Sequence, residues 1–206
     1  HSALRLLAFQ DTSSPRLLNL LATSKGEDIR VCVADNKNTP LETLEILSKD
    51  DNYRVRKAIA GNANTKESII LRLCREDKNS EVLQELARSP RTPVEGLRML
   101  AKSEEPEVRE NLAISQNTPG DVLAMFVYDD NAKVMWGIST HDNVTPETLR
   151  ELLNVDIRPY ARRKNVLKAI AKNPNAPVDV LFELEKNENS LVSENASVNL
   201  RARDNS

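Results

Sequence analysis

The segment Val55-Arg56-Lys57-Ala58-Ile59-Ala60 leads through Asn62 to Thr65, and near copies of it decide the fold of this chain. One copy, Val108-Arg109-Glu110-Asn111-Leu112-Ala113, leads through Ser115 to Thr118-Pro119. Another, Val166-Leu167-Lys168-Ala169-Ile170-Ala171, leads through Asn173 to Ala176-Pro177. Self-similarity at a period of about 20 to 50 residues indicates stacked structural repeats. The chain is therefore predicted to be a helical-repeat protein.

Each repeat begins at an apolar reference residue, and eight such residues fit the chain: Leu4, Ile29, Val55, Val82, Val108, Val134, Val166 and Val192. Four residues after the reference comes a second apolar residue, and a small one follows it in most units. Apolar residues at positions i and i+4 mark one face of a short helix. Pairs such as Thr39-Pro40 and Thr118-Pro119 then predict a second helix, with Thr as its N-cap and Pro at its first position.

Two further rows of residues recur at fixed phase. Seven residues after the reference, most units carry Asn or a small polar residue, as in Asn36, Asn62 and Asn173. We expect these side chains to form a stacked capping ladder rather than a ligand site. One residue after the reference, Arg30, Arg56 and Arg109 recur. We expect them to pair with Asp or Glu of neighbouring units rather than with a ligand.

Composition restricts the possible classes of function. Hydrophobic residues make up 39%, charged residues 29% and aromatic residues 3% of the 206 residues, with a net charge of −2. This balance is typical of a folded protein and gives no global attraction to nucleic acid or to an anionic membrane. Two cysteines exclude a disulfide framework and favour a reducing compartment. With no apolar run long enough to span a bilayer and no signal peptide, we expect a cytoplasmic protein without a cofactor.

The repeated phrase Val-Arg-x-x-(Val/Ile/Leu)-Ala-x-Asn-x-x-Thr-Pro-x-x-x-Leu-x-x-Leu resembles the leucine-rich repeat variant family, most clearly over Ile29–Leu47, Val55–Leu73 and Val108–Phe126. The resemblance implies an all-α fold, a right-handed α-solenoid of about eight repeats of roughly 26 residues each, with α-helices alternating with short α or 3₁₀ helices and no β-sheet. Armadillo and HEAT repeats are similar in outline but usually longer. A founding member holds an iron–sulfur cluster through clustered cysteines, which this chain lacks.

We expect residues 1–206 to form one helical-repeat domain, with an irregular insertion at residues 154–163. The repeats run almost end to end, which favours one elongated domain over two. A start at His1-Ser2 instead of Met suggests a fragment of a longer chain.

The sixth unit and the insertion after it carry the candidate partner-binding residues: Met135, Trp136, His141, Arg158, Tyr160, Arg162, Arg163 and Lys164. Insertions in repeat proteins tend to form loops, often on the binding face. Trp136 is either a partner anchor or a cover for the loop, and packing against Tyr160 or Pro159 is the favoured interpretation. The basic cluster could bind an acidic peptide, phosphate or RNA, although a solvated loop is the commoner outcome. We interpret His141 as a bonded loop residue.

The sequence contains no recognisable catalytic motif, because it has no GxSxG, Walker-type loop, HExxH or CxxC. Cys32 and Cys74 are predicted to be small core fillers. We therefore expect a non-enzymatic scaffold that binds a protein or peptide. The alternative is a nucleic-acid-binding or DNA-glycosylase-like helical-repeat protein, which would need a continuous basic face. A lyase-type or assembly-factor role is a third possibility that no residue selects.

Overall fold

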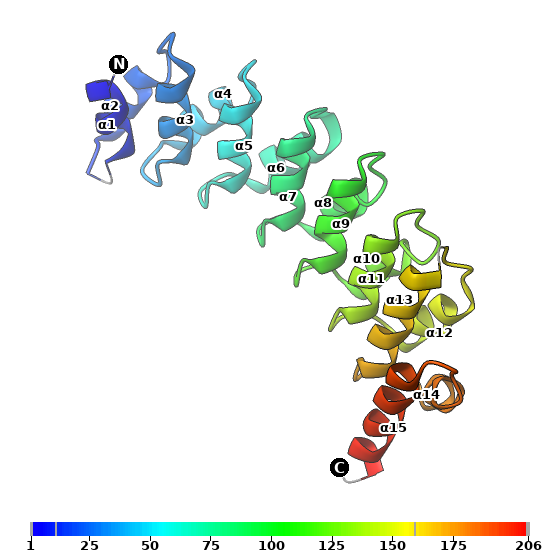
Figure 1. Ribbon diagram of the computed structural model, residues 1–206. Coiled ribbons are helices and arrows are strands. Elements are labelled where there is room, and N and C mark those ends of the chain that lie inside the picture. The colour runs from blue at the N-terminus through cyan, green and yellow to red at the C-terminus, as the bar shows by residue number, and fades with distance from the viewer. Residues whose placement is uncertain (1, 11, 159, 205–206) are drawn as a thin grey trace. The chain divides into compact units, whose positions relative to one another are not determined.

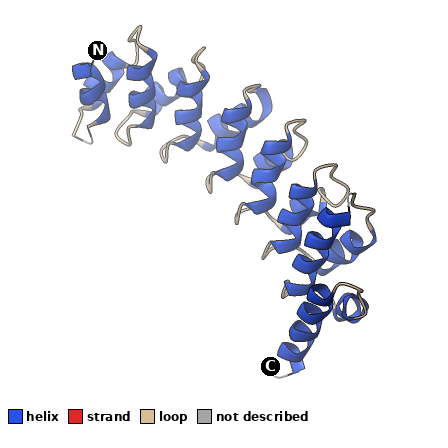
Figure 2. Ribbon diagram, in the orientation of Figure 1, coloured by secondary structure: helices blue, strands red, loops and turns tan. Residues whose placement is uncertain are grey.

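A computed structural model describes residues 2–10, 12–158 and 160–204, and the side chains of residues 2, 160 and 161 are also outside the description. The regular secondary structure in these ranges consists of fifteen α-helices and contains no strand (Figure 2). No helix within them is both long and apolar enough to cross a bilayer. The helices form two compact units, unit 1 (residues 1–100) and unit 2 (residues 101–206), which are considered in turn.

Unit 1 alternates first helices with second helices (Figure 1). The first helices, α1, α3, α5 and α7, pack side by side in one row, and α6 and α8 pack together in the row of second helices. The bounds are α1 (Ser2–Phe9), α2 (Pro15–Leu21), α3 (Glu27–Asp35), α4 (Leu41–Leu47), α5 (Tyr53–Gly61), α6 (Glu67–Glu76), α7 (Ser80–Arg88) and α8 (Val94–Leu100).

Unit 2 has the same alternation, with α9, α11, α13 and α15 packed in one row. The second helix α14 packs against α15. The bounds are α9 (Pro106–Ile114), α10 (Gly120–Ala124), α11 (Ala132–Thr140), α12 (Pro146–Asn154), α13 (Tyr160–Lys172), α14 (Val178–Glu185) and α15 (Ser190–Asp204). The predicted all-α helical-repeat fold is confirmed, whereas the prediction of one domain over residues 1–206 stays a prediction.

Burial follows the repeat phase. Val55, Ile59 and Ala60 on α5 are each fully buried, and so are Val108 and Leu112 on α9. Most of these helices have seven to ten residues, and isolated helices shorter than ~12 residues are marginal in water. Their stability therefore comes from packing on the neighbouring repeats.

The predicted capping ladder is confirmed. The Asn62 side-chain amide donates to the carbonyl oxygens of Ala34 (2.6 Å) and Asn36 (3.1 Å) in the preceding repeat. Its Oδ1 accepts the backbone N–H of Asn64 at 2.8 Å. Asn36, Asn173 and Asn199 donate to the preceding repeat in the same way. The row satisfies buried carbonyls at the C-terminal ends of the first helices, which would otherwise lack partners.

The recurrent arginines form structural ion pairs. Arg30 contacts Asp50 through Nε at 2.6 Å and through its terminal nitrogen at 2.9 Å, and it also donates to the Ser24 carbonyl. Arg56 pairs with Asp77, and Arg109 with Asp129, in the same bidentate geometry. The prediction that these arginines serve structure is confirmed, but each pairs with the aspartate that follows its own repeat's second helix.

The Thr-Pro interpretation was correct for only part of the chain. Thr145 is an N-cap whose hydroxyl accepts the Thr148 N–H at 3.2 Å, with Pro146 at the first position. At the same register in unit 1, however, the Thr39 and Thr65 hydroxyls donate backward to the carbonyls of Val33 and Ile59. The turn between the two helices is tight, so the hydroxyl lies over a buried carbonyl of the helix that has just ended. The following helix then begins after Pro40 or Lys66, without a side-chain cap.

The insertion was expected to form a loop, but half of it is helical. Residues 155–158 leave α12 as a loop, whereas α13 already begins at Tyr160, six residues before its reference residue Val166. The other first helices after α1 begin two residues before theirs. The run Ala161-Arg162-Arg163-Lys164 consists of strong helix formers, which extends α13 toward the N-terminus.

Candidate functional site

Trp136 is an exposed aromatic residue on α11, in the first-helix row of α9, α11 and α13. The buried stripe of α11 is formed by Val134 and Ile138, which lie two residues to either side of Trp136, so the indole faces away from the core. Its exposed fraction is 46%. Other repeats place polar residues such as Lys57, Gln84 and Glu110 at this register.

A glycine next to the tryptophan brings α11 close to α9. A Cβ atom at Gly137 would lie 2.8 Å from the Ala113 Cβ and 3.2 Å from the Ala113 carbonyl oxygen, closer than packing allows. The backbones can approach only because Gly137 has no side chain. The residue beside Trp136 therefore lies in the close contact between α11 and α9.

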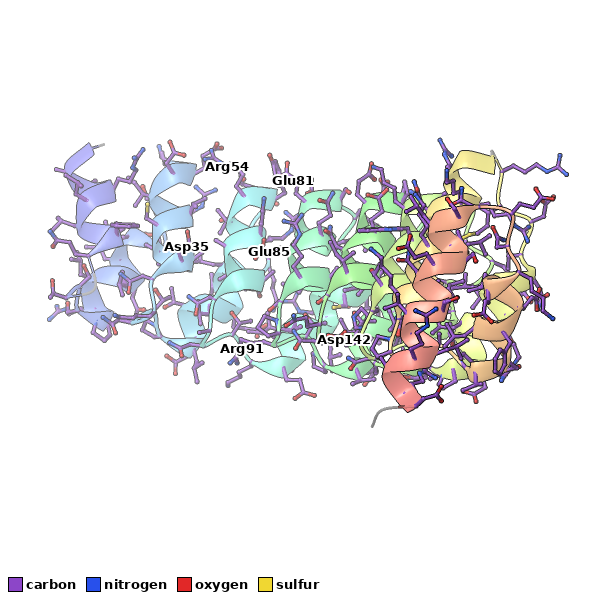
Figure 3. All side chains as sticks on the ribbon, turned by 60° about the horizontal axis from the view of Figure 1, so that its bottom comes forward. Asp35, Arg54, Glu81, Glu85, Arg91 and Asp142 are labelled. Carbon is purple, nitrogen blue, oxygen red and sulfur yellow. The ribbon has the colours of Figure 1, made fainter. Side chains whose placement is uncertain are left out.

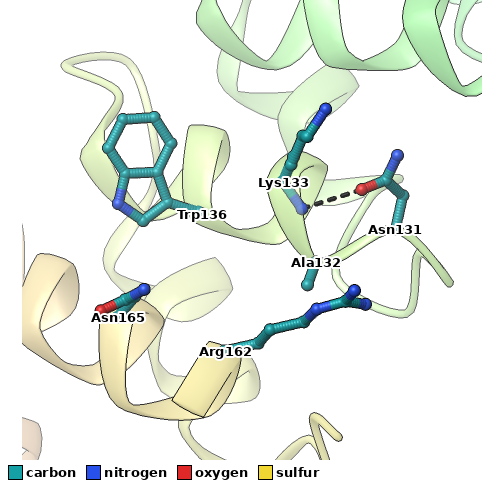
Figure 4. Close-up of a pocket in the computed structure, with 6 residues that line it drawn as sticks. All are labelled: Asn131, Ala132, Lys133, Trp136, Arg162 and Asn165. Atoms are coloured by element: carbon teal, nitrogen blue, oxygen red, sulfur yellow. Dashed lines mark hydrogen bonds between the residues drawn. The ribbon is translucent and has the colours of Figure 1, made fainter. Parts of the chain in front are cut away.

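Two hollows flank the indole. The first, the Trp136 hollow, has a volume of about 330 Å³ and is lined by Asn131, Ala132, Lys133, Trp136, Arg162 and Asn165 (Figure 4). The second, the Ile114 hollow, has a volume of about 510 Å³ and is lined by Ile114, Gln116, Trp136, Gly137, Thr140, His141, Asp142 and Asn143. Ile114 on α9 is 59% exposed. Trp136 thus forms a ridge between two depressions on one face of unit 2.

The two cations of the Trp136 hollow differ in their partners. Lys133 on α11 lies 3.5 Å from the Glu110 carboxylate on α9. Arg162 comes from the added first turn of α13 and is exposed. Among residues that the structure describes, Arg162 has no ion-pair partner. The hollow therefore carries one uncompensated positive charge beside an aromatic face.

The residues of the basic cluster predicted from the sequence differ in their partners and positions. Arg158 is exposed and pairs with Asp156 at 2.9 Å. Arg163 donates to the Val155 and Leu153 carbonyls at the end of α12, which gives it a structural role. Lys164 is half-buried. Arg162 alone of the cluster reaches the Trp136 hollow.

The remaining candidates lie deeper or outside the description. Met135 is buried, with 6% of its surface exposed, so we leave it out of the candidate surface. His141 takes the ladder position, as interpreted: its Nδ1 accepts the Asn143 N–H, and its Nε2 therefore donates to the Ser115 carbonyl, both at 2.9 Å. The side chain of Tyr160, and Pro159 with it, lie outside the described residues. Packing of Trp136 against either one stays a prediction.

Sequence reasoning did not single out Ile114, Lys133 or Asn165, which the fold places beside Trp136. A signal for Ile114 was present. Its register, six residues after the reference, carries Asp35, Gly61, Arg88, Thr140 and Lys172 in other repeats, and Val198 is the other β-branched apolar residue there. Lys133 and Asn165 come together only because α11 and α13 are neighbours.

The corresponding row of unit 1 differs in chemistry. There Arg54 pairs with Glu27 and Asp28, and Lys57 with Glu81. Figure 3 shows Arg54 and Glu81 toward one edge of this row, and Asp35 and Glu85 nearer its middle. Burial, and secondarily the charge of Glu85, raises the pKa of Asp35. Unit 1 thus presents compensated charges and two carboxylates, without an exposed tryptophan.

The described nucleophiles are poorly activated. Burial raises the pKa of the Cys74 thiol to about 12, and burial also raises the pKa of Cys32. Because the thiolate is the reactive form, both groups are weak nucleophiles at neutral pH. The described residues contain no group of three or more His, Cys, Asp or Glu side chains placed to hold a metal ion.

These features define a helical-repeat protein with an aromatic ridge on one face. No protein-family model and no curated protein matches the chain. Among solved structures it is similar to a leucine-rich repeat variant with a novel repetitive structural motif, at 21% identity and a TM-score of 0.70 over 92% of this chain and 73% of that one. The predicted resemblance to the leucine-rich repeat variant is thus confirmed at the level of fold.

Two engineered proteins align with lower scores. An engineered protein matches at 17% identity and a TM-score of 0.42 over 97% of this chain and 72% of its own. A designed armadillo repeat protein matches at 16% identity and a TM-score of 0.27 over 98% and 92% of the two chains.

Proposed function

We propose that this chain is a non-enzymatic interaction module that binds a protein or peptide on the α9–α11–α13 face of unit 2. The observation that carries the proposal is Trp136, which is 46% exposed between two hollows, at a register that is polar in most other repeats. An indole in water has a large apolar surface to bury and little side-chain entropy to lose. Such residues dominate binding energy when a partner covers them.

Three further features support binding rather than catalysis. In unit 2, His141 bonds the Ser115 carbonyl and Asn173 bonds the Ser139 and His141 carbonyls, so the first helices are joined by hydrogen bonds that give a partner a rigid surface. Both thiols are protonated at neutral pH, and the ring nitrogens of His141 are both engaged in structural hydrogen bonds. The face therefore offers shape and charge rather than an activated nucleophile or base.

The proposal can be tested by panning a displayed library of random peptides against the full chain and against its Trp136→Ala variant. We expect the wild-type chain to enrich a family of peptides and the variant to lose them. Truncation of a buried hot-spot tryptophan costs about 2 kcal/mol or more, which corresponds to roughly a 30-fold weaker Kd.

Two exposed aromatic residues of unit 2 provide matched controls. Tyr128 is 78% exposed and Phe182, on α14, is 52% exposed, and both lie outside the two hollows. Tyr128→Ala and Phe182→Ala should retain the enriched peptides. If all three alanine variants bind equally, or if the wild-type chain enriches nothing, the proposal is wrong.

The nucleic-acid alternative rests on the cations of α13. The same surface, however, also carries Glu107 and Glu110 on α9, and a nucleic-acid groove is usually basic throughout and lined by several aromatic residues. Gel-shift titrations with single-stranded and duplex nucleic acid at low salt provide the comparison. Tight binding that is lost in Trp136→Ala would favour that alternative over peptide binding.

A further inference from the structure

We infer that the occupant of the Trp136 hollow is an acidic peptide segment. A bulky apolar side chain would lie on the indole, and a neighbouring carboxylate would pair with Arg162. This inference rests on the proposed function and specifies the chemistry of its partner.

The first argument for an acidic occupant is the positive charge of α13. Residues 157–178 contain six Lys or Arg and no Asp or Glu, although unit 2 as a whole is acidic. Arg162, Lys168 and Lys172 occupy one stripe of α13 together with Asn165, because their spacing follows the helical period. Within the described ranges none of the three cations has an ion pair. In the same row of unit 2, Arg109 on α9 and Lys133 on α11 are both paired.

An uncompensated guanidinium at a binding surface favours a planar anion. Arg162 can donate two parallel hydrogen bonds to a carboxylate, and these are stronger when a neighbouring aromatic ring excludes water. Arg162 and Trp136 line the same hollow, so a single short segment in it can contact both groups. Figure 4 shows the two side chains coming from different helices, Trp136 from α11 and Arg162 from α13, around one hollow.

The surroundings orient the ligand. The Ile114 hollow, on the other side of the indole, includes Asp142, an exposed carboxylate. A ligand carboxylate placed there would meet a like charge, whereas one placed in the Trp136 hollow meets Arg162. We therefore place the ligand's acidic residue toward α13 and its apolar continuation toward Ile114 on α9.

Size and charge pattern favour a peptide over a nucleic acid. A volume of about 330 Å³ accommodates one or two side chains rather than a series of bases. The cations follow one helix, and other first helices of the row carry carboxylates at the register of Lys168, namely Glu110 on α9 and Glu194 on α15. A polyphosphate backbone crossing the row would meet these carboxylates, while a peptide with one or two acidic residues need not.

The test uses the peptides that the full chain enriches and Trp136→Ala loses. We expect these peptides to contain more Asp and Glu than the unselected library, next to an aromatic or large aliphatic residue. For the best of them, measured by fluorescence anisotropy, Arg162→Glu should weaken binding by about tenfold or more, through like-charge repulsion. Raising NaCl from about 0.05 M to about 0.5 M should also weaken binding of the wild-type chain.

Arg158→Glu is the matched control, because Arg158 is exposed in the same segment but lies outside the hollow. It should change the Kd less than about twofold, since an exposed side chain without a ligand contact contributes little. Circular dichroism of each variant checks that the helices remain.

The outcomes separate this inference from the proposed function. Enrichment of Trp136-dependent peptides that are neutral or basic overturns the acidic occupant but leaves the peptide-binding module intact. No enrichment at all overturns both. If a single-stranded RNA pool binds more tightly than any peptide and loses affinity in Trp136→Ala, the inference is also wrong.

Discussion

At the scale of single residues, the repeats are held by polar side chains that each satisfy several backbone groups. Arg30 joins the Asp50 carboxylate to the Ser24 and Lys25 carbonyls, and Asp50 in turn accepts the Asn52 N–H. Where the residue after the reference is Leu83 instead of arginine, Ser103 replaces the aspartate. From the second repeat onward, arginine and aspartate therefore occur together or are both replaced, as expected for a pair in which either partner is costly to bury alone; the first repeat, with Arg5 and Ser24, is the exception.

Substitution of Asp50 should show the value of this pair and its dependence on pH. Burial alone would raise the pKa of Asp50, but the hydrogen bonds from Arg30 and the Asn52 amide outweigh burial and lower it below its ordinary value. A carboxyl with a lowered pKa in the folded state stabilises the protein above its unfolded pKa of about 3.9, and this contribution is lost as pH falls further. We expect Asp50→Asn to reduce the free energy of unfolding by about 1–3 kcal/mol at pH 7.

Urea titrations at several pH values provide the measurement for Asp50. The difference from the wild-type chain should shrink below about pH 4, as the wild-type carboxyl becomes protonated. The neighbouring Asp51 is exposed, and Asp51→Asn should have almost no effect. A difference that stays constant down to pH 2 would show that Asp50 acts through shape and not charge.

At the scale of helices, the ladder connects the end of one first helix to the end of the next. The ladder is interrupted at Ser89, whose hydroxyl accepts the Arg91 N–H at 3.4 Å and, among the residues that the structure describes, bonds no group of the preceding repeat. Asparagine at the equivalent position 62 makes two additional bonds across the layer. Ser89 therefore makes fewer hydrogen bonds at this ladder position than an asparagine would.

The substitution Ser89→Asn should restore this position. The new amide would lie over the carbonyl oxygens at the end of α5, and we expect the free energy of unfolding to rise by about 0.5–2 kcal/mol. Thermal and urea unfolding measure the gain. Ser89→Ala serves as the comparison, since it removes the hydroxyl without adding an amide. A gain of equal size in both variants would mean that the new amide is not the cause.

Packing between α9 and α11 is the second feature at this scale. Gly137→Ala should lower the free energy of unfolding by about 1–3 kcal/mol, because the added methyl group would overlap Ala113. The net change is a loss because the steric overlap should cost more than the roughly 1 kcal/mol by which alanine stabilises a helix interior relative to glycine. Displacement of α11 should also shift Trp136, which its fluorescence spectrum reports directly as the only tryptophan of the chain.

Gly61→Ala is the matched control for Gly137→Ala. A Cβ atom there would meet only the Glu85 carboxylate oxygen at 3.3 Å, the mobile end of a long side chain. We expect Gly61→Ala to be neutral or slightly stabilising. If both glycine variants unfold at the same denaturant concentration, the close approach of α11 to α9 is not what Gly137 provides.

For the whole molecule, the sequence predicted what repetition determines and failed where the repeats differ. The repeat phase alone predicted the buried reference residues, the Asn62-type ladder and the arginine row, because each repeat packs against its neighbours in the same way. The helical start of α13 did not, since propensity within the insertion competed with the expectation of a loop. Trp136 and Arg162 line one hollow only because α11 and α13 are neighbours. The contact of Gly137 with Ala113 depends on the distance between two helices, which the sequence of a single repeat does not encode.

Repetition also predicts how the molecule unfolds. Each repeat is stabilised mainly by its neighbours, so a core defect should spread over adjacent repeats and fade with distance along the chain. Ile59 on α5 is fully buried, and Ile59→Ala should cost about 2–5 kcal/mol through the lost contacts and the cavity left behind. Hydrogen exchange read by mass spectrometry should then accelerate most in α3, α5 and α7, which pack on one another, and least in α13 and α15.

The exposed isoleucine of the neighbouring helix α4 gives the control for Ile59→Ala. Ile46 has 67% of its surface exposed, and Ile46→Ala should leave exchange in α3, α5 and α7 almost unchanged. A uniform acceleration from α1 to α15 in Ile59→Ala would mean that the chain opens as one cooperative body. That result would contradict nearest-neighbour stabilisation, because a defect in one repeat would then reach all repeats equally.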